Sequence, residues 1–192
     1  MTRRLILGLT GASGVIYGIR ALQLLRAAAV ETHLVLSPAA KITIAQETQW
    51  KVSDVEALAS VAYDYRDVGA AIASGSFATL GMLVAPCSIK TLSAIANSYS
   101  GDLLTRAADV CLKEGRPLLL MVRETPLHKG HLKLMLDAAD AGAILFPPVP
   151  AFYAQPQTLD EVIDNTVGRA LARLGIENSA YHHWQGMGKN DE

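Results

Sequence analysis

The chain has 192 residues, of which 51% are hydrophobic and 18% charged, and its formal net charge is −1 at pH 7. This composition is typical of a single globular domain that buries about 70% of its unfolded surface, and the small net charge excludes the basic surface by which proteins bind nucleic acids or anionic membranes. The two cysteines, Cys87 and Cys111, lack a C-x-x-C spacing, which excludes a disulfide framework or zinc cluster and predicts a cytoplasmic protein.

Apolar runs alternate with helical patterns along the chain. The first run follows basic residues but ends at Gly8, too short for a secretion signal, and no stretch reaches the ~18 apolar residues of a membrane span. The predicted strands are Leu5–Leu9, Thr32–Leu36, Met82–Ala85, Leu118–Val122 and Ala143–Phe146. The predicted helices are Val15–Ala28, Ala39–Gln46, Leu92–Asn97, Asp102–Lys113, Leu132–Ala141 and Leu159–Leu174. This alternation predicts an α/β fold with a doubly wound, mainly parallel sheet, a three-layer sandwich of the Rossmann or flavodoxin type.

Two segments do not follow the alternation. Residues 49–78 are weakly periodic and interrupted by Ser and Gly, so we expect a surface excursion there. Residues 1–184 are expected to form one domain, followed by a polar C-terminal tail at 185–192. Because ligands of doubly wound sheets bind at the carboxyl ends of the strands, the candidate site residues are those that directly follow each apolar run.

The first predicted strand ends in the small-residue turn Thr10-Gly-Ala-Ser-Gly14, after which a helix begins. The backbone N–H groups of such a turn and helix start attract anions, Gly11 admits a ligand close to the backbone, and Ser13 adds a hydroxyl donor. The glycines do not form G-x-G-x-x-G, and the second strand ends in Ser37 instead of a carboxylate. The pattern favours a phosphate site for FMN over one for NAD, with an ordinary tight turn as the alternative.

The third strand is expected to end at Pro86. Behind it, Ser88 and Thr91 either donate to a phosphate or cap the next helix, and Lys90 is either a phosphate partner or a solvated side chain. Cys87 is interpreted as a small buried residue and not as a nucleophile, because no histidine lies near it in the sequence.

Charged residues follow the fourth strand. Arg123 suits a bidentate grip on phosphate, and a desolvated Glu124 would have a raised pKa and could move a proton. A salt bridge between the two is the alternative. Upstream, Arg106 and Lys113 lie seven residues apart on one face of a predicted helix, which is a solvated face unless a ligand uses it.

The fifth strand leads into the rigid, proline-rich segment 147–153, which cannot continue as a central strand and is expected to form a fixed wall. Its Tyr153, together with Arg169 and Trp184 farther along, either contacts a substrate or has a purely structural role. The acidic cluster at 160–164 follows a capping box at Thr158, so it is assigned to helix-dipole compensation and not to magnesium. The histidines lack ligand spacing, and no metal is predicted.

Together these motifs resemble the flavin prenyltransferase family. Over residues 4–184, in chain order, they are Thr10-Gly-Ala-Ser-Gly14, Ala85-Pro-Cys-Ser88, Arg106-Ala-Ala-Asp109, Lys113-Glu114, Arg116-Pro-Leu118, Arg123-Glu-Thr-Pro126 and Pro147 through Phe152-Tyr153. The resemblance implies a flavodoxin-like fold and an enzyme whose substrates are reduced FMN and dimethylallyl phosphate. The prenyl unit would join N5 and then C6 of the flavin. The product, prenylated FMN, would serve a partner decarboxylase of the ubiquinone or aromatic-acid type, and the implied assembly is a homododecamer with its site between subunits.

The resemblance also assigns roles residue by residue. FMN would be held by Gly11, Ala12, Ser13, Ser37, Ser88, Ile89, Lys90, Thr91, Arg106 and Arg123. The prenyl phosphate would be surrounded by Tyr153, Arg169, Lys113, Arg123, Glu124 and Trp184. Catalytic roles would fall to Glu124, Ser13 and Glu47. Two departures from the family pattern are Gly115, where an Arg is frequent, and His182-His183, where an Arg commonly precedes the tryptophan.

Three other functions fit parts of the same pattern. The chain could be a non-catalytic FMN-binding subunit that supports assembly of an aromatic acid decarboxylase, or it could decarboxylate an aromatic acid itself. A flavin-dependent cysteine decarboxylase is the third alternative. Those enzymes carry a Pro-x-Met-Asn signature, whereas no methionine in this chain is followed by asparagine.

Overall fold

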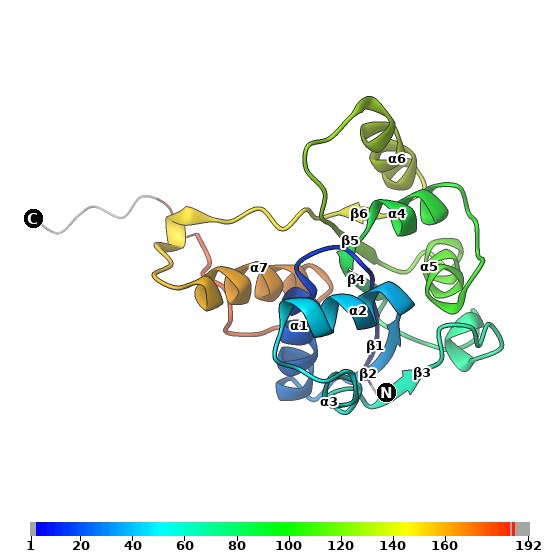
Figure 1. Ribbon diagram of the computed structural model, residues 1–192, viewed down its shortest axis with the longest axis horizontal. Coiled ribbons are helices and arrows are strands. Elements are labelled where there is room, and N and C mark those ends of the chain that lie inside the picture. The colour runs from blue at the N-terminus through cyan, green and yellow to red at the C-terminus, as the bar shows by residue number, and fades with distance from the viewer. Residues whose placement is uncertain (1–2, 185, 187–192) are drawn as a thin grey trace, which may run out of the picture.

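The computed structural model describes residues 3–184 and 186, in which six parallel strands form one sheet with the order β3-β2-β1-β4-β5-β6 (Figure 1). The strands are β1 (Arg4–Leu9), β2 (Glu31–Leu36), β3 (Val61–Tyr63), β4 (Met82–Cys87), β5 (Leu118–Val122) and β6 (Ile144–Leu145). The predicted doubly wound α/β fold is confirmed. The strand order reverses between β1 and β4, and such a switch point is where doubly wound sheets bind ligands.

Helices cover both faces of the sheet. They are α1 (Val15–Ala27), α2 (Pro38–Glu47), α3 (Val52–Glu56), α4 (Ile89–Ala96), α5 (Leu103–Lys113), α6 (Lys129–Asp140) and α7 (Leu159–Arg173). Leu7 faces the core formed with α1 and α7, while its neighbour Ile6 faces the core formed with α4 and α5. Because successive strand residues point to opposite faces, strands buried on both faces are apolar at every position.

The structure differs from the predicted elements in two regions. The segment 49–78 contains the short α3, the edge strand β3 and a 3-10 turn at Ala71–Ala73. β3 was not predicted because it has only three residues, two of them exposed. The expectation that Pro86 ends the third strand is wrong: β4 continues to Cys87, with an irregular register against β5 between Val84 and Cys87. A proline fits a strand at such an irregularity, where one ladder hydrogen bond is already lost.

Element ends also shift where side chains cap a helix. The fourth and sixth helices begin at Ile89 and Lys129, three residues before their predicted starts, because Ser88 and His128 accept hydrogen bonds from the first-turn amides. Of the predicted tail at 185–192, all but Gly186 lies outside the described residues. Over the described part of the chain, no helix combines the length and the apolar character needed to cross a membrane.

A buried histidine holds the edge strand β3 onto the sheet. His33 on β2 is 3% exposed, with Nε2 at 3.0 Å from Glu31 Oε1 and Nδ1 at 2.9 Å from the Tyr63 hydroxyl. The edge of its ring contacts Phe77, with 5.0 Å between the centroids. Burial lowers the pKa of His33 below its ordinary value, although hydrogen bonding to Glu31 opposes that shift. The imidazole is therefore neutral at pH 7.

We expect acid to destabilise this protein through His33. The histidine binds a proton more readily in the unfolded chain than in the folded one, so its contribution to stability is present above pH of about 6.5 and is lost as the pH falls. One such group changes the unfolding free energy by at most about 1.4 kcal/mol per pH unit. Thermal melts of the native protein and of His33→Gln, recorded from neutral to mildly acidic pH, should show a smaller pH dependence in the variant. If the melting temperature fell equally steeply with pH in both proteins, groups other than His33 would be responsible for the acid sensitivity.

Candidate functional site

The carboxyl ends of β1 and β4 are joined through Thr10, which follows β1 and is 1% exposed. Its Oγ1 donates to the Pro86 carbonyl at 2.7 Å and accepts from the Ser88 amide at 2.8 Å. These bonds satisfy the buried hydroxyl and bring the 10–14 loop beside the start of α4. The sequence analysis placed Thr10 in the predicted phosphate turn at 10–14 but assigned it no role of its own.

The N-termini of α2 and α4 flank this loop. Ser37 Oγ accepts from the Ala40 amide at 3.1 Å, and Ser88 Oγ accepts from the Thr91 amide at 3.3 Å. Both serines therefore cap their helices, and both keep a hydroxyl at the positive end of a helix dipole. The loop is packed tightly on α2, since a Cβ on Gly11 would lie 2.3 Å from the Ala39 Cβ.

The first amides of α1 bind a carboxylate of the protein itself. Glu47, the last residue of α2, accepts from the Gly14 amide at 2.8 Å and from the Val15 amide at 3.4 Å. A phosphate was predicted at this helix start, but the structure has Glu47 there, because a carboxylate compensates the helix dipole equally well. Ser13, in the same loop, is exposed.

The residues after β5 are exposed at the same edge. The Arg123 amide donates to the Cys87 carbonyl at 3.1 Å, and Glu124 Oε1 accepts from the Thr125 amide at 2.9 Å. Within the described residues no ion pair joins Arg123 to Glu124, so the salt-bridge alternative is not formed. Cys87 is fully buried, and burial raises the pKa of its thiol to about 12. This supports the interpretation of Cys87 as a packing residue.

Arg169 on α7 lines a second part of the edge, a cavity of about 180 Å³. The other lining residues are Leu145, Phe146, Pro147, Val149, Ala151, Asn165 and Thr166.

Next to the cavity, the rings of Tyr153 and Trp184 meet edge to face, with 5.5 Å between their centroids. The His182 backbone connects them to α7, since its amide donates to Asn165 Oδ1 at 3.0 Å and its carbonyl accepts from the Tyr153 hydroxyl at 3.0 Å. A cationic head group beside apolar and aromatic walls suits a ligand that is apolar at one end and anionic at the other. Asn165 was not predicted, and a buried amide in the middle of an amphipathic helix is the signal for it.

The acidic cluster at the start of α7 pairs with α1. Arg20 Nη2 lies 3.2 Å from Asp160 Oδ1, and Arg20 Nη1 lies 2.7 Å from Asp164 Oδ1. The cluster thus fastens α7 to α1 in addition to its place near a helix N-terminus. Nowhere in the described ranges do three His, Cys, Asp or Glu side chains gather closely enough to hold a metal ion.

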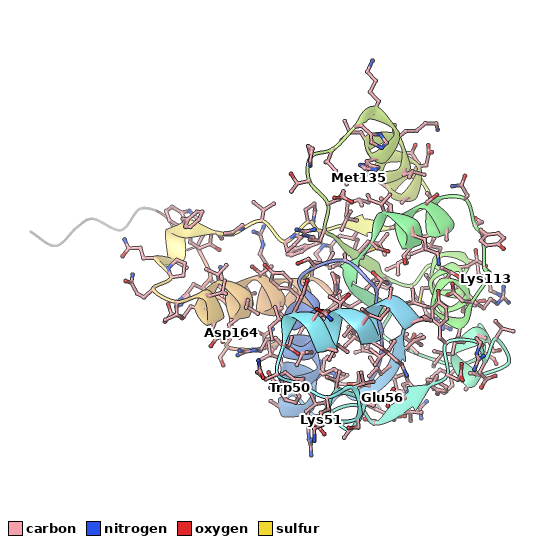
Figure 2. The ribbon with its side chains drawn as sticks, in the orientation of Figure 1. Trp50, Lys51, Glu56, Lys113, Met135 and Asp164 are labelled. Carbon is pink, nitrogen blue, oxygen red and sulfur yellow. The ribbon has the colours of Figure 1, made fainter. Side chains whose placement is uncertain are left out.

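Two other predicted residues, Arg106 and Lys113, lie elsewhere. Arg106 and Lys113 are on α5, which packs on the opposite face of the sheet from α7, and Figure 2 shows Lys113 on the far side of the molecule from Asp164 of α7. They pair with Asp109 and Glu114, at 3.4 and 3.2 Å. Lys113 is at the end of α5, about 10 Å along the helix axis from Arg106. One chain therefore does not bring Lys113 together with Arg169.

Known proteins match nearly the whole chain in sequence and in fold. Residues 1–170 match the family model described as Flavoprotein. The flavin prenyltransferase UbiX of Escherichia coli K12 is 58% identical over 187 residues, which cover 96% of this chain and 99% of that protein. The crystal structure of AnUbiX (PadA1) in complex with FMN and dimethylallyl pyrophosphate has a TM-score of 0.95 at 46% identity, covering 97% and 99% of the two chains. A dodecameric FMN-dependent UbiX-like decarboxylase from Escherichia coli O157:H7 has a TM-score of 0.92 at 48% identity, covering 95% and 100%.

Proposed function

This chain belongs to the flavin prenyltransferase family, and we propose that it joins a dimethylallyl group from dimethylallyl phosphate to N5 and C6 of reduced FMN. The product would pass to a partner decarboxylase of the ubiquinone or aromatic-acid type. The observation that carries the proposal is the cavity of Arg169 beside the Tyr153–Trp184 pair. An allylic phosphate needs apolar, aromatic walls around its carbon chain and a fixed cation at its leaving group, and this cavity offers both.

The switch point between β1 and β4 suits FMN as the second substrate. Ser37, Ser88 and Thr91 have hydroxyls there, at the positive ends of α2 and α4, and Ser13 adds a hydroxyl from the 10–14 loop. We propose that these hydroxyls hold the flavin phosphate and ribityl chain, and that Arg123 adds a charge at the flavin edge. The other proposed FMN contacts are Gly11, Ala12, Ile89, Lys90 and Arg106.

Two carboxylates and a hydroxyl complete the proposed chemistry. The bond to N5 would form as the C–O bond to the phosphate breaks. Ring closure at C6 would then use the prenyl C=C: one of its carbons bonds C6, the other gains a proton, and C6 loses its own. We assign the acceptance of the C6 proton to Glu124. Glu47 accepts hydrogen bonds from two backbone amides that follow Ser13. Glu47 and Ser13 are proposed to orient the flavin against the prenyl chain. The chemistry that FMN supplies is a nucleophilic N5 in its reduced form.

We propose that the complete site is formed between copies of the chain in a homododecamer. Lys113 is on the opposite face of the sheet from Arg169 in one chain, and a second copy can supply it to the same phosphate. Tyr153 and Trp184 are 43% and 59% exposed in one chain, which suits side chains that a neighbouring copy covers. The structural relative from Escherichia coli O157:H7 is dodecameric.

We further propose that the enzyme works in the cytoplasm and that residues 1–184 form its single functional domain. Cys87 and Cys111 are free thiols buried in the core, as expected for a protein that folds in a reducing compartment. The relative from Escherichia coli K12 aligns over 96% of the chain, which supports one functional unit.

The function is tested by anaerobic incubation with reduced FMN and a prenyl donor, followed by mass spectrometry of the flavin. A gain of one five-carbon prenyl unit is the expected result, and a reaction without donor is the control. Dimethylallyl monophosphate and pyrophosphate should be compared, since the relative AnUbiX was crystallised with the latter. Unchanged but tightly bound FMN would favour the assembly-subunit function. Release of CO2 from an aromatic acid without flavin modification would favour direct decarboxylation.

A further inference from the structure

The end of α5 lies against the turn at residues 74–77, to which Arg116 is hydrogen-bonded. The helix ends in a Schellman motif in which the Gly115 amide donates to the Leu112 carbonyl at 3.0 Å and the Arg116 amide to the Cys111 carbonyl at 2.8 Å. Gly115 has φ of +65°, so the departure from the family pattern at this position places a glycine where the backbone favours one. The direction of the chain after α5 is thereby fixed.

Arg116 attaches this helix end to the neighbouring turn. Its Nη2 donates to the Gly75 carbonyl at 2.5 Å and its Nη1 to the Phe77 carbonyl at 2.8 Å. Two hydrogen bonds to two carbonyls hold the planar guanidinium of Arg116 in one orientation. The backbone of the turn is therefore in a defined position relative to Glu114 and Lys113.

Glu114 contacts both the turn and Lys113. Its Oε1 lies 3.2 Å from Lys113 Nζ, and a Cβ added to Gly75 would come within 2.1 Å of the same oxygen. The φ of Gly75 is outside the left-handed region, so the backbone does not demand glycine there. A side chain at position 75 would therefore push the flexible end of Glu114 away from its present place beside Lys113.

We propose that Gly75 and Glu114 are positioning residues for Lys113. The lysine ammonium is on a flexible four-carbon stem, and holding it in one place costs side-chain entropy. The Glu114 carboxylate lies against Gly75 and forms an ion pair with the ammonium, whose hydrogens can still be donated to the phosphate of the prenyl donor in a neighbouring copy. This inference rests on the proposed function, because it acts through the phosphate contact of Lys113.

The test is steady-state prenylation by the full-length enzyme with Gly75→Ala, Glu114→Ala and Lys113→Ala. Gly75→Ala should raise the KM for dimethylallyl phosphate about fivefold, the factor expected for one exposed charge pair, and leave kcat and the affinity for FMN near native values. Gly69→Ala is the matched control in the same segment, since its Cβ would meet only Asp67 Oδ1 at 3.6 Å. Glu114→Ala should act like Gly75→Ala, and the double variant should be no worse than either alone because both disrupt one contact. Glu114→Gln keeps an acceptor oxygen and should restore part of the native KM.

The outcomes separate this inference from the function on which it rests. If Lys113→Ala raises the donor KM while Gly75→Ala and Glu114→Ala do not, the positioning role is wrong and the role of Lys113 stands. If Lys113→Ala leaves the donor KM unchanged, the proposed phosphate contact fails and the positioning role fails with it. A loss of melting temperature and FMN affinity in Gly75→Ala, without a specific rise in donor KM, would mean a structural role only.

Discussion

A Glu124→Gln enzyme is expected to bind both substrates and to turn over about 10²–10⁴ times more slowly than the native enzyme. Glutamine cannot accept the proton that leaves C6 during ring closure. It does keep an oxygen that can accept from the Thr125 amide, as Glu124 Oε1 does at 2.9 Å, so the loop after β5 should keep its shape. The loss should therefore fall on kcat, with little change in the KM for the donor or in the affinity for FMN.

The measurement is the rate of prenylated FMN formation under anaerobic conditions, with FMN affinity and melting temperature determined in parallel. Glu177→Gln is the matched control, since it removes an exposed carboxylate that is not part of the proposed site. Normal turnover by Glu124→Gln would remove Glu124 as the proton acceptor. A raised donor KM with native kcat would reassign it to substrate binding.

Replacing Arg169 with alanine should lower kcat/KM for the prenyl donor by about 10²–10³. The guanidinium is proposed to stabilise the charge that develops on the departing phosphate, and this contribution is largest where water is excluded. Arg173→Ala is a close control, because Arg173 is exposed one turn farther along α7 and outside the cavity that Arg169 lines. Steady-state kinetics with the donor varied and FMN saturating would separate the two variants. If Arg169→Ala and Arg173→Ala lowered kcat/KM for the donor equally, the effect would come from the loss of a positive charge on α7 and not from a phosphate contact of Arg169.

Co-assembly of two impaired variants, Arg169→Ala and Lys113→Ala, tests whether the site is shared between copies. Lys113→Ala should also impair use of the donor, yet the two side chains lie on opposite faces of the sheet in one chain. If each site takes Arg169 from one copy and Lys113 from another, a random 1:1 assembly of the two variants leaves about a quarter of the sites intact. Activity should return only when the chains are co-expressed or refolded together. A co-assembled oligomer without recovered activity would mean that the two residues do not serve one site in trans.

The sequence by itself determined the sheet, its doubly wound fold and the edge that carries the site. Short apolar runs that alternate with helical patterns indicate strands buried on both faces, and their carboxyl ends select the residues after each run. The short edge strand β3 was not found in this way. The turn at 10–14, the serines at 37 and 88, and the charged pair at 123–124 were found in this way, because each is directly next to an apolar run. The matching motifs then identified the family, which the comparisons confirm.

Tertiary structure decided which partners these residues have. Sequence spacing could not show that Glu47 accepts from the first amides of α1 or that Thr10 joins β1 to β4. Both contacts join segments more than 30 residues apart in the chain. The same holds for the separation of Lys113 from Arg169, since the side of the sheet on which a helix packs depends on the path of the whole chain. Local patterns fix an element and its exposed ends, whereas contacts between distant elements form only when the sheet orders them in space.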